Sequence, residues 1–265
     1  MNKTKIEWVI NPDGSRGFTW NVVTGCLHGC DYCYARKIAN RFAGTALKRK
    51  FIEDTQVEQV IDGVVQEFLL EEHPGFYPTL WDSRLEDPVY IKKPSTIFAG
   101  SMADLFGKWI PEIWIERILK TVKKCPQHTF LFLTKNGSGM CEKGDVIDTE
   151  NAWYGQTCTG IPGEPIYDIP NGRHFLSFEP LLGDDWIPDQ RILHINWVIV
   201  GSLNRNGKAV HPDNGGTKKE WALKVIAEAE RLNIPIFIKS ELLKLYPGLP
   251  ERKDLPYQGN KHEKQ

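Results

Sequence analysis

The sequence predicts an α/β protein in which parallel strands form a partial or complete (β/α) barrel with helices outside it. Short, continuously apolar stretches recur along the chain, and amphipathic segments of helical length lie between several of them. Each apolar stretch runs out into polar residues. Barrels of this class carry their chemistry on the loops that follow the C-terminal ends of the strands.

The first expected strand, Phe18–Val23, combines aromatic and β-branched residues and leads into Thr24. A weaker strand is placed near Pro78–Leu80, inside a proline-containing loop. A regular pattern then begins with Thr96–Gly100. It continues with strands at Thr129–Leu133, Trp153–Cys158, His174–Phe178, Trp197–Val200 and Pro235–Ile238.

Apolar residues at helical spacing predict helices over Tyr34–Leu47, Phe51–Glu72, Pro111–Lys124 and Lys218–Leu232. No internal repeat interrupts the pattern. The 265 residues, 41% of them hydrophobic, therefore fit a single domain over residues 1–265. The polar, proline-rich tail from about residue 248 is expected to be poorly ordered.

Composition restricts the classes of protein that this chain resembles. The net charge of −1 provides no global argument for binding nucleic acid or membrane, although a local basic groove is compatible with it. No apolar run approaches the roughly 18 residues needed to span a bilayer, and the N-terminus lacks the apolar core of a signal peptide. We therefore expect a cytoplasmic protein whose clustered cysteines bind metal rather than form disulfides.

The segment around Cys26, Cys30 and Cys33 is the strongest functional signal in the sequence. The three residues form a C-x3-C-x2-C motif directly after the first strand. Iron and zinc both accept thiolate ligands. Three protein ligands leave one metal position open, which is typical of catalytic sites. The alternative is a structural zinc site completed by His28 or a distant residue.

The motif, with Tyr32 directly before the last cysteine, resembles the radical S-adenosylmethionine (SAM) superfamily. The resemblance implies a (β/α) barrel of radical SAM type and a [4Fe–4S] cluster bound by Cys26, Cys30 and Cys33. It also implies SAM bound at the fourth iron and cleaved to a 5′-deoxyadenosyl radical. An external one-electron donor of the flavodoxin or ferredoxin type would reduce the cluster.

Longer strings extend this resemblance over most of the chain. They are GSMADLF (Gly100–Phe106), CPQHTFLFLTK (Cys125–Lys135), FLSFEPLLG (Phe175–Gly183) and WVIVGS (Trp197–Ser202). These strings are similar to the three-Cys-motif proteins of phages and prophages. Where that family has Gly-Gly-Glu, this chain has Gly201-Ser202-Leu203, so it departs from the family's pattern at this contact.

The phage resemblance implies a protein of the host cytoplasm that acts on a modified, thymidine-derived pyrimidine in DNA, or on its nucleotide. The reaction expected is a rearrangement, of isomerase or mutase type, or another modification of the base. The runner-up is a zinc-stabilised module that binds nucleic acid or protein without catalysis.

The resemblance and the positions of the strand ends together suggest cofactor contacts. Gly100, Ser101 and Asp104 follow one strand and are expected to hold the amino group or ribose of SAM. Asp104 has a simpler alternative, a favourable charge at a helix N-terminus. Ser177 and Glu179 are expected to bind the ribose or the substrate.

Three further strand-end residues are candidate catalytic groups. Lys135 and Lys239 are expected to hold a carboxylate or phosphate, with solvation as the alternative. Cys158 is a candidate hydrogen-atom donor to a substrate radical. Its alternative, a small buried residue, is the commoner role for a free cysteine.

Overall fold

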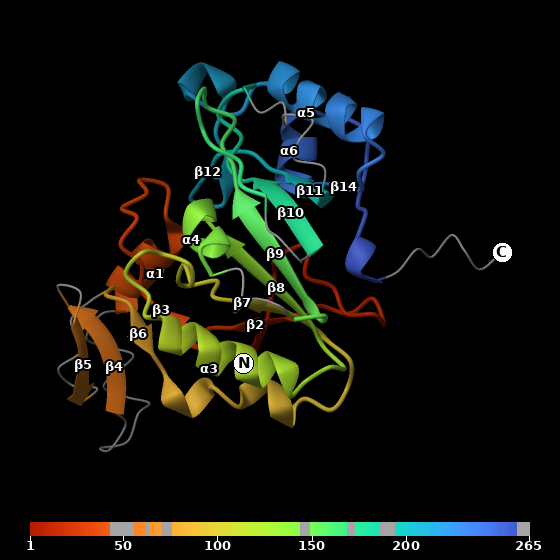
Figure 1. The fold of residues 1–265 in the computed structure, drawn as a ribbon. Coiled ribbons are helices and arrows are strands. Elements are labelled where there is room, and N and C mark those ends of the chain that lie inside the picture. Colours follow the sequence, from red (N-terminus) through yellow and green to blue (C-terminus); the bar gives the residue numbers. More distant parts are fainter. Residues whose placement is uncertain are drawn as a thin grey trace.

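The computed structural model describes residues 1–42, 56–61, 64–69, 76–143, 149–168, 173–185 and 194–258. These residues form a mixed α/β fold around an eight-stranded sheet of order β1-β2-β7-β8-β9-β10-β11-β14 (Figure 1). Only β1 pairs antiparallel in this sheet; every other pairing is parallel. The expected parallel α/β core is therefore confirmed. Its strands are β1 (Asn2–Lys3), β2 (Phe18–Trp20), β7 (Thr96–Ala99), β8 (Thr129–Thr134), β9 (Ala152–Thr157), β10 (Arg173–Phe178), β11 (Ile195–Val200) and β14 (Ile236–Ile238).

The helices lie between the strands, as the apolar spacing predicts. The described α-helices are α1 (Tyr34–Phe42), α3 (Glu112–Lys123), α4 (Gly137–Cys141), α5 (Lys219–Arg231) and α6 (Ser240–Leu245). Pro111 stands just before α3, where its missing N–H costs no helical hydrogen bond. The expected helix over Tyr34–Leu47 is present as α1, and its last five positions lie outside the described residues.

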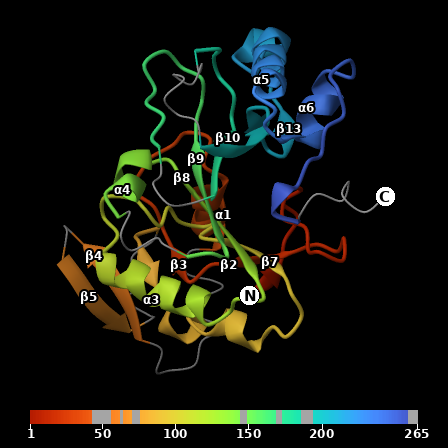
Figure 2. The same ribbon diagram turned by 45° about the vertical axis from the view of Figure 1, so that its right-hand side comes forward.

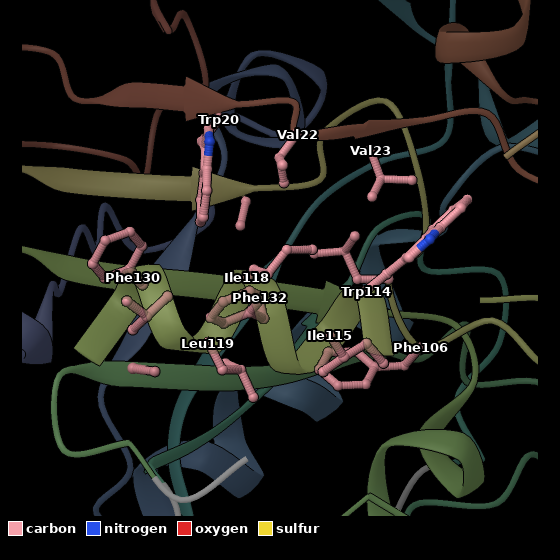
Figure 3. Packing of buried hydrophobic residues seen from close by; sticks show 14 of the residues in the cluster. Trp20, Val22, Val23, Phe106, Trp114, Ile115, Ile118, Leu119, Phe130 and Phe132 are labelled. Atoms are coloured by element: carbon pink, nitrogen blue, oxygen red, sulfur yellow. The ribbon is translucent and has the colours of Figure 1, made fainter. Parts of the chain in front are cut away.

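Three apolar clusters fill the two faces of the sheet. Figure 3 shows the first cluster, in which Trp114, Ile118 and Leu119 of α3 pack against Trp20 and residues of the neighbouring strands. The second cluster lies between β10, β11, β14 and α5. The third covers the opposite face and is largely aromatic, with Trp8, Phe98, Trp153, Phe175 and Trp197. Strand residues alternate between the two faces, which is why nearly all of them are apolar.

The prediction of a helix over Phe51–Glu72 is wrong. The described residues there form two antiparallel strands, β4 (Gln56–Ile61) and β5 (Val64–Leu69). Their valines and isoleucine prefer strands, and Asp62-Gly63 between them is a common hairpin sequence. The helical count i, i+3, i+4 matched these residues by coincidence. Residues 51–55, 62–63 and 70–72 lie outside the described part of the chain.

The β4–β5 hairpin belongs to a second, antiparallel sheet of order β3-β6-β4-β5. The expected strand Phe18–Val23 is divided, with β3 (Val23–Thr24) entering this sheet after β2 has ended. The weak strand near Pro78–Leu80 exists as β6 (Thr79–Leu80), in the small sheet. Figures 1 and 2 both show β4 and β5 of this sheet at one edge of the molecule.

The tail expected to be disordered from about residue 248 instead packs against the sheet up to residue 258. The amide of Ile238 donates to the carbonyl of Arg252 at 2.9 Å. The hydroxyl of Tyr257 donates to the carbonyl of Trp8 at 2.7 Å, and Leu249 is buried. Leu255 and Tyr257 cover the aromatic cluster, so this polar-looking tail carries apolar residues that the core requires. Residues 259–265 lie outside the described part of the chain.

No helix in the described part of the chain has the length and apolar character needed to cross a bilayer.

His174, at the start of β10, should make the fold sensitive to acid. Its side chain is fully buried, and neither ring nitrogen has a hydrogen-bond partner among the described residues. Burial lowers the pKa of His174 from 6.5 to about 4. As pH falls, His174 binds a proton at a higher pH in the unfolded chain than in the folded protein. The free energy of unfolding should therefore decrease as pH drops from about 6.5 towards 4. The full loss is on the order of 3 kcal/mol.

Replacing His174 with leucine should remove this part of the acid sensitivity and raise the urea midpoint at pH 5. The measurement is urea unfolding at several pH values, followed by tryptophan fluorescence. His194→Leu, a change at an exposed histidine, is the control and should leave the pH profile almost unchanged. An identical pH profile in wild type and His174→Leu would contradict the assignment.

Candidate functional site

A cavity of about 620 Å³ opens where the parallel strands end. Its wall carries one polar or charged residue from each of six neighbouring strand ends. They are Ser101 after β7, Lys135 after β8, Thr157 at the end of β9, Glu179 after β10, Ser202 after β11 and Lys239 after β14. The carboxyl ends of parallel strands meet at one edge of a sheet, so this convergence follows from the topology.

The cysteine loop forms another part of the same wall. Cys26, Cys30 and Cys33 all line the cavity and are half-buried. The loop is attached to the segment after β7, where the amide of Gly25 donates to the carbonyl of Met102 at 2.9 Å. It is attached on its other side to residue 76, because the amide of Cys26 donates to the carbonyl of Phe76 at 3.2 Å.

The sulfur atom of Cys26 lies in surroundings that favour the neutral thiol. Burial raises the pKa of Cys26 to about 11, and the neighbouring Asp104, Cys33 and Cys30 add to the rise. The sulfur of Cys33 accepts a hydrogen bond from the amide of Arg36 at 3.3 Å. Within the described ranges, no group of three or more His, Cys, Asp and Glu side chains is arranged to hold a metal ion. The three sulfurs therefore share one cavity wall without forming a closed metal site.

Asp104 joins the cysteine loop to the ends of β7 and β8. One carboxylate oxygen accepts from the hydroxyl of Thr134 at 2.6 Å and from the amide of Phe106 at 3.1 Å. The other accepts from the amide of Lys135 at 2.8 Å and from Nε2 of His28 at 2.7 Å. Asp104 is only 5% exposed, so its two carboxylate oxygens accept hydrogen bonds mainly from these four protein donors and not from water.

The four bonds change the interpretation of Asp104. No helix begins at this residue, so the helix N-terminal alternative does not apply. The carboxylate instead fixes His28, whose ring also meets the edge of Trp109 at 4.8 Å between ring centroids. The sequence suggests His28 only as an alternative zinc ligand. Its pairing with Asp104 joins residues that lie far apart in the chain, so the sequence does not predict it.

Glu179 and Lys239 form an ion pair in the wall of the cavity. The same carboxylate accepts from the indole N–H of Trp8 at 3.2 Å and from the hydroxyl of Ser177 at 3.3 Å. Burial disfavours the charged form of Lys239, but the charge and hydrogen bond of Glu179 outweigh it and raise the pKa of Lys239. Gly201 lies against both side chains, because an added Cβ would stand 2.9 Å from Cγ of Glu179 and 3.0 Å from Cδ of Lys239.

Lys135 is held against the cysteine loop. Its Nζ donates to the hydroxyl of Tyr32 at 3.1 Å and stands 5.0 Å from the centroid of the same ring. The aromatic residue before the last cysteine therefore positions a cation at the cavity wall.

Two predicted residues do not reach the cavity. Ser177 is fully buried and contacts the site only through Glu179. Cys158 is 1% exposed and packs in the apolar cluster with Leu176 and Phe178, and burial raises the pKa of its thiol. This position matches the alternative of a small buried residue. It does not match a hydrogen-atom donor facing a substrate.

Helix α1 contributes further side chains to the cavity wall, including Arg41, for which the sequence allows a contact with the cluster or a carboxylate. Tyr34, Lys37, Ile38 and Arg41 line the cavity from one helical face. Arg36, on another face, donates from Nη2 to the carbonyl of Cys26 at 2.9 Å. Positions 34, 37, 38 and 41 share one face of a helix that directly follows the cysteine motif. This spacing could have predicted that their side chains lie together near the cysteines.

Comparison with known proteins assigns a family to this chain but no activity. No curated protein and no solved structure matches it. Residues 3–242 match a family of proteins of unknown function, DUF5131. This match includes the cysteine loop and every strand of the parallel sheet apart from the first residue of β1. The chain therefore belongs to the DUF5131 family.

Proposed function

We propose that this protein is a radical SAM enzyme. In this proposal Cys26, Cys30 and Cys33 hold a [4Fe–4S] cluster, and SAM occupies the adjoining part of the cavity. The observation that supports it best is the position of the three thiols. They share one cavity with the polar ends of six parallel strands, which is where barrel enzymes carry their active sites.

The strand order agrees with an incomplete (β/α) barrel of radical SAM type. From β2 to β14 the parallel strands are neighbours in the order in which the chain visits them. Among the described residues no pairing joins β14 back to β1 or β2, so a barrel of this kind is open on one side. The N-terminal segment and the tail around Tyr257 cover the inner aromatic face.

The three thiols have the chemistry of iron–sulfur ligands, although the described side chains are not arranged to hold a metal ion in this structure. Thiolates are the usual ligands of [4Fe–4S] clusters, and three of them leave one iron for another ligand. When bound in its reduced form, the cluster would supply the one electron that splits a carbon–sulfur bond of SAM into methionine and a 5′-deoxyadenosyl radical. The carbonyl of Cys26 is already held by Arg36, so one end of the ligand loop is fixed before a cluster binds.

The other side chains of the cavity have binding and positioning roles in this proposal. Gly100 and Ser101, beside the cysteines, are contacts for the amino group or ribose of SAM. Asp104 orients the cysteine loop through His28. Lys135 supplies positive charge to the wall for a carboxylate or phosphate, and Lys239 would do so only by exchanging its ion pair with Glu179 for the ligand.

The substrate proposed is a modified, thymidine-derived pyrimidine in phage DNA, and the reaction is a rearrangement or modification that begins with hydrogen abstraction. The similarity to phage three-Cys-motif proteins supports this choice. The electron would come from a donor of the flavodoxin or ferredoxin type.

The test is anaerobic reconstitution with iron and sulfide, followed by reduction with dithionite in the presence of SAM. We expect a brown protein with iron–sulfur absorption and 5′-deoxyadenosine among the products. Cys30→Ala should lower the yield of 5′-deoxyadenosine by more than about 100-fold, because a direct ligand is lost. Cys141→Ala, a cysteine outside the cavity, is the matched control and should retain the activity.

Two results would contradict the proposal. The first is a colourless protein that binds one zinc ion tightly, which would favour a zinc-stabilised binding module. The second is a Cys30→Ala variant that cleaves SAM as fast as the Cys141→Ala control. Either result would remove the radical mechanism without changing the fold.

A further inference from the structure

Exposed, positively charged side chains lie in the wall of the cavity and on a hairpin next to it. Lys37 and Arg41 of α1 line the cavity and are exposed. In the hairpin of β12 (Asn204–Arg205) and β13 (Lys208–Ala209), the turn lines the cavity, and the exposed Arg205 and Lys208 flank that turn. We call Lys37, Arg41, Arg205 and Lys208 the cationic rim. Figure 1 shows α1 and β12 on the side of the sheet towards which β8 and β9 point.

We propose that the cationic rim binds the phosphodiester backbone of an unpaired nucleic-acid strand, so that one base of that strand enters the cavity. The argument for phosphate binding uses only the rim. The identity of the reacting group as a base rests on the function proposed above.

The charge at the cavity is positive although the whole chain has a net charge of −1. The acidic residues of the described cavity wall are Asp104 and Glu179. Asp104 is taken up by its four hydrogen bonds, and Glu179 is paired with Lys239. Among the wall residues that the structure describes, the four Lys and Arg side chains outnumber the two carboxylates, so an anionic ligand would be attracted to the opening.

The β12–β13 hairpin places two like charges side by side. Arg205 and Lys208 lie directly opposite each other in its register, and both are exposed. Neither has an ion pair within the ranges that the structure describes. Like charges in opposite positions destabilise a hairpin, and a phosphate between them would remove this cost.

The tip of the hairpin is held in one conformation. Asn206 and Gly207 have φ values of 53° and 78°, which are the left-handed values that a two-residue Asn-Gly turn requires. Asn206 and Gly207 line the cavity, so Arg205 and Lys208 directly follow the cavity wall along the chain on either side of the turn.

Aromatic side chains line the same cavity as the cysteines and as Lys37 and Arg41. Tyr34 is 55% exposed at the opening, and Tyr32 and Phe76 also line the cavity. Aromatic rings beside basic residues form the usual binding surface for single strands, where bases stack on the rings and cations follow the backbone. A duplex keeps its bases in the stack, so an enzyme that works inside a cavity needs the base unpaired or flipped out.

The experiment measures binding of a fluorescein-labelled, single-stranded, thymine-containing oligodeoxynucleotide to the full chain by anisotropy. It needs neither cluster nor SAM, so failure of reconstitution leaves this test intact. Lys37→Gln/Arg41→Gln and Arg205→Gln/Lys208→Gln should each weaken binding by at least about tenfold at low salt. Each should also reduce the slope of log K against log salt by about 0.7 per lost phosphate contact.

The matched control is Lys120→Gln/Lys123→Gln, which removes the same charge from exposed positions of α3 outside the cavity wall. This variant should bind like the wild type. Equal weakening by all three double variants, or no binding by the wild type at low salt, would overturn the proposal. Tighter binding of a duplex of the same sequence than of the single strand would also overturn the proposal, because the cationic rim would then bind double-stranded DNA in preference to an unpaired strand.

Discussion

Replacing Gly25 with alanine is expected to lower the free energy of unfolding by more than about 3 kcal/mol. Gly25 has a φ of +93°, which L-residues rarely adopt. A Cβ there would lie 1.9 Å from the carbonyl oxygen of Tyr77, an impossible separation. The backbone must shift, and the hydrogen bond from Gly25 to Met102 must break with it.

Gly29→Ala is the matched control, because Gly29 lies in the same loop with a φ of +70° but has nothing within 4 Å of an added Cβ. It should cost only the conformational strain, about 1 kcal/mol. Urea unfolding followed by tryptophan fluorescence measures both values. Iron content after reconstitution gives a second comparison, in which Gly25→Ala should hold less iron than Gly29→Ala. Equal destabilisation by the two substitutions would contradict the close packing of Gly25 against residue 77.

Replacing Asp104 with alanine is expected to cost about 3–5 kcal/mol. The substitution leaves the hydroxyl of Thr134, the amides of Phe106 and Lys135, and the ring of His28 without their acceptor. All four surround a buried position, so water replaces the carboxylate only in part. Asp104→Asn should fall between alanine and wild type, because its single amide oxygen serves one pair of donors.

Asp213→Ala is the control for Asp104, since that side chain is 86% exposed and its removal should change stability by less than about 0.5 kcal/mol. The comparison is again made by urea unfolding. A second measurement is limited proteolysis around residue 28, which should become faster in Asp104→Ala because the cysteine loop loses its attachment through His28. An Asp104→Ala variant as stable as Asp213→Ala would show that the four hydrogen bonds are replaceable by solvent.

The hairpin and the tail show where sequence patterns were insufficient. The apolar residues between positions 57 and 68 satisfy a helical count, but the backbone pairs them as β4 and β5. In the sequence, only the two residues Asp62-Gly63 indicated a hairpin, and so short a motif was outweighed by the longer apolar pattern. The tail from 248 has the composition of a disordered segment, yet Tyr257 and Leu255 complete an aromatic cluster that lies far away in sequence.

The candidate site divides in the same way. The three cysteines, Lys135, Glu179 and Lys239 were found from a spacing motif and from their places after apolar strands, and all of them line one cavity. Cys158 shared that sequence position but its side chain points into the apolar cluster behind the sheet. A residue's place at the end of a strand predicts that it lies at the edge of the sheet. Which face of the sheet its side chain points to depends on the alternation of side chains along the strand.

The sequence alone determined the parallel α/β core, because continuous apolar strands and amphipathic helices are local patterns that one chain segment contains in full. It also identified the cysteine motif, which depends only on spacing. The tertiary structure decided which residues meet: His28 with Asp104, Lys135 with Tyr32, and α1 with the β12–β13 hairpin across one opening. The physical reason is that hydrogen bonds and packing between residues far apart in the chain depend on the closure of the whole fold.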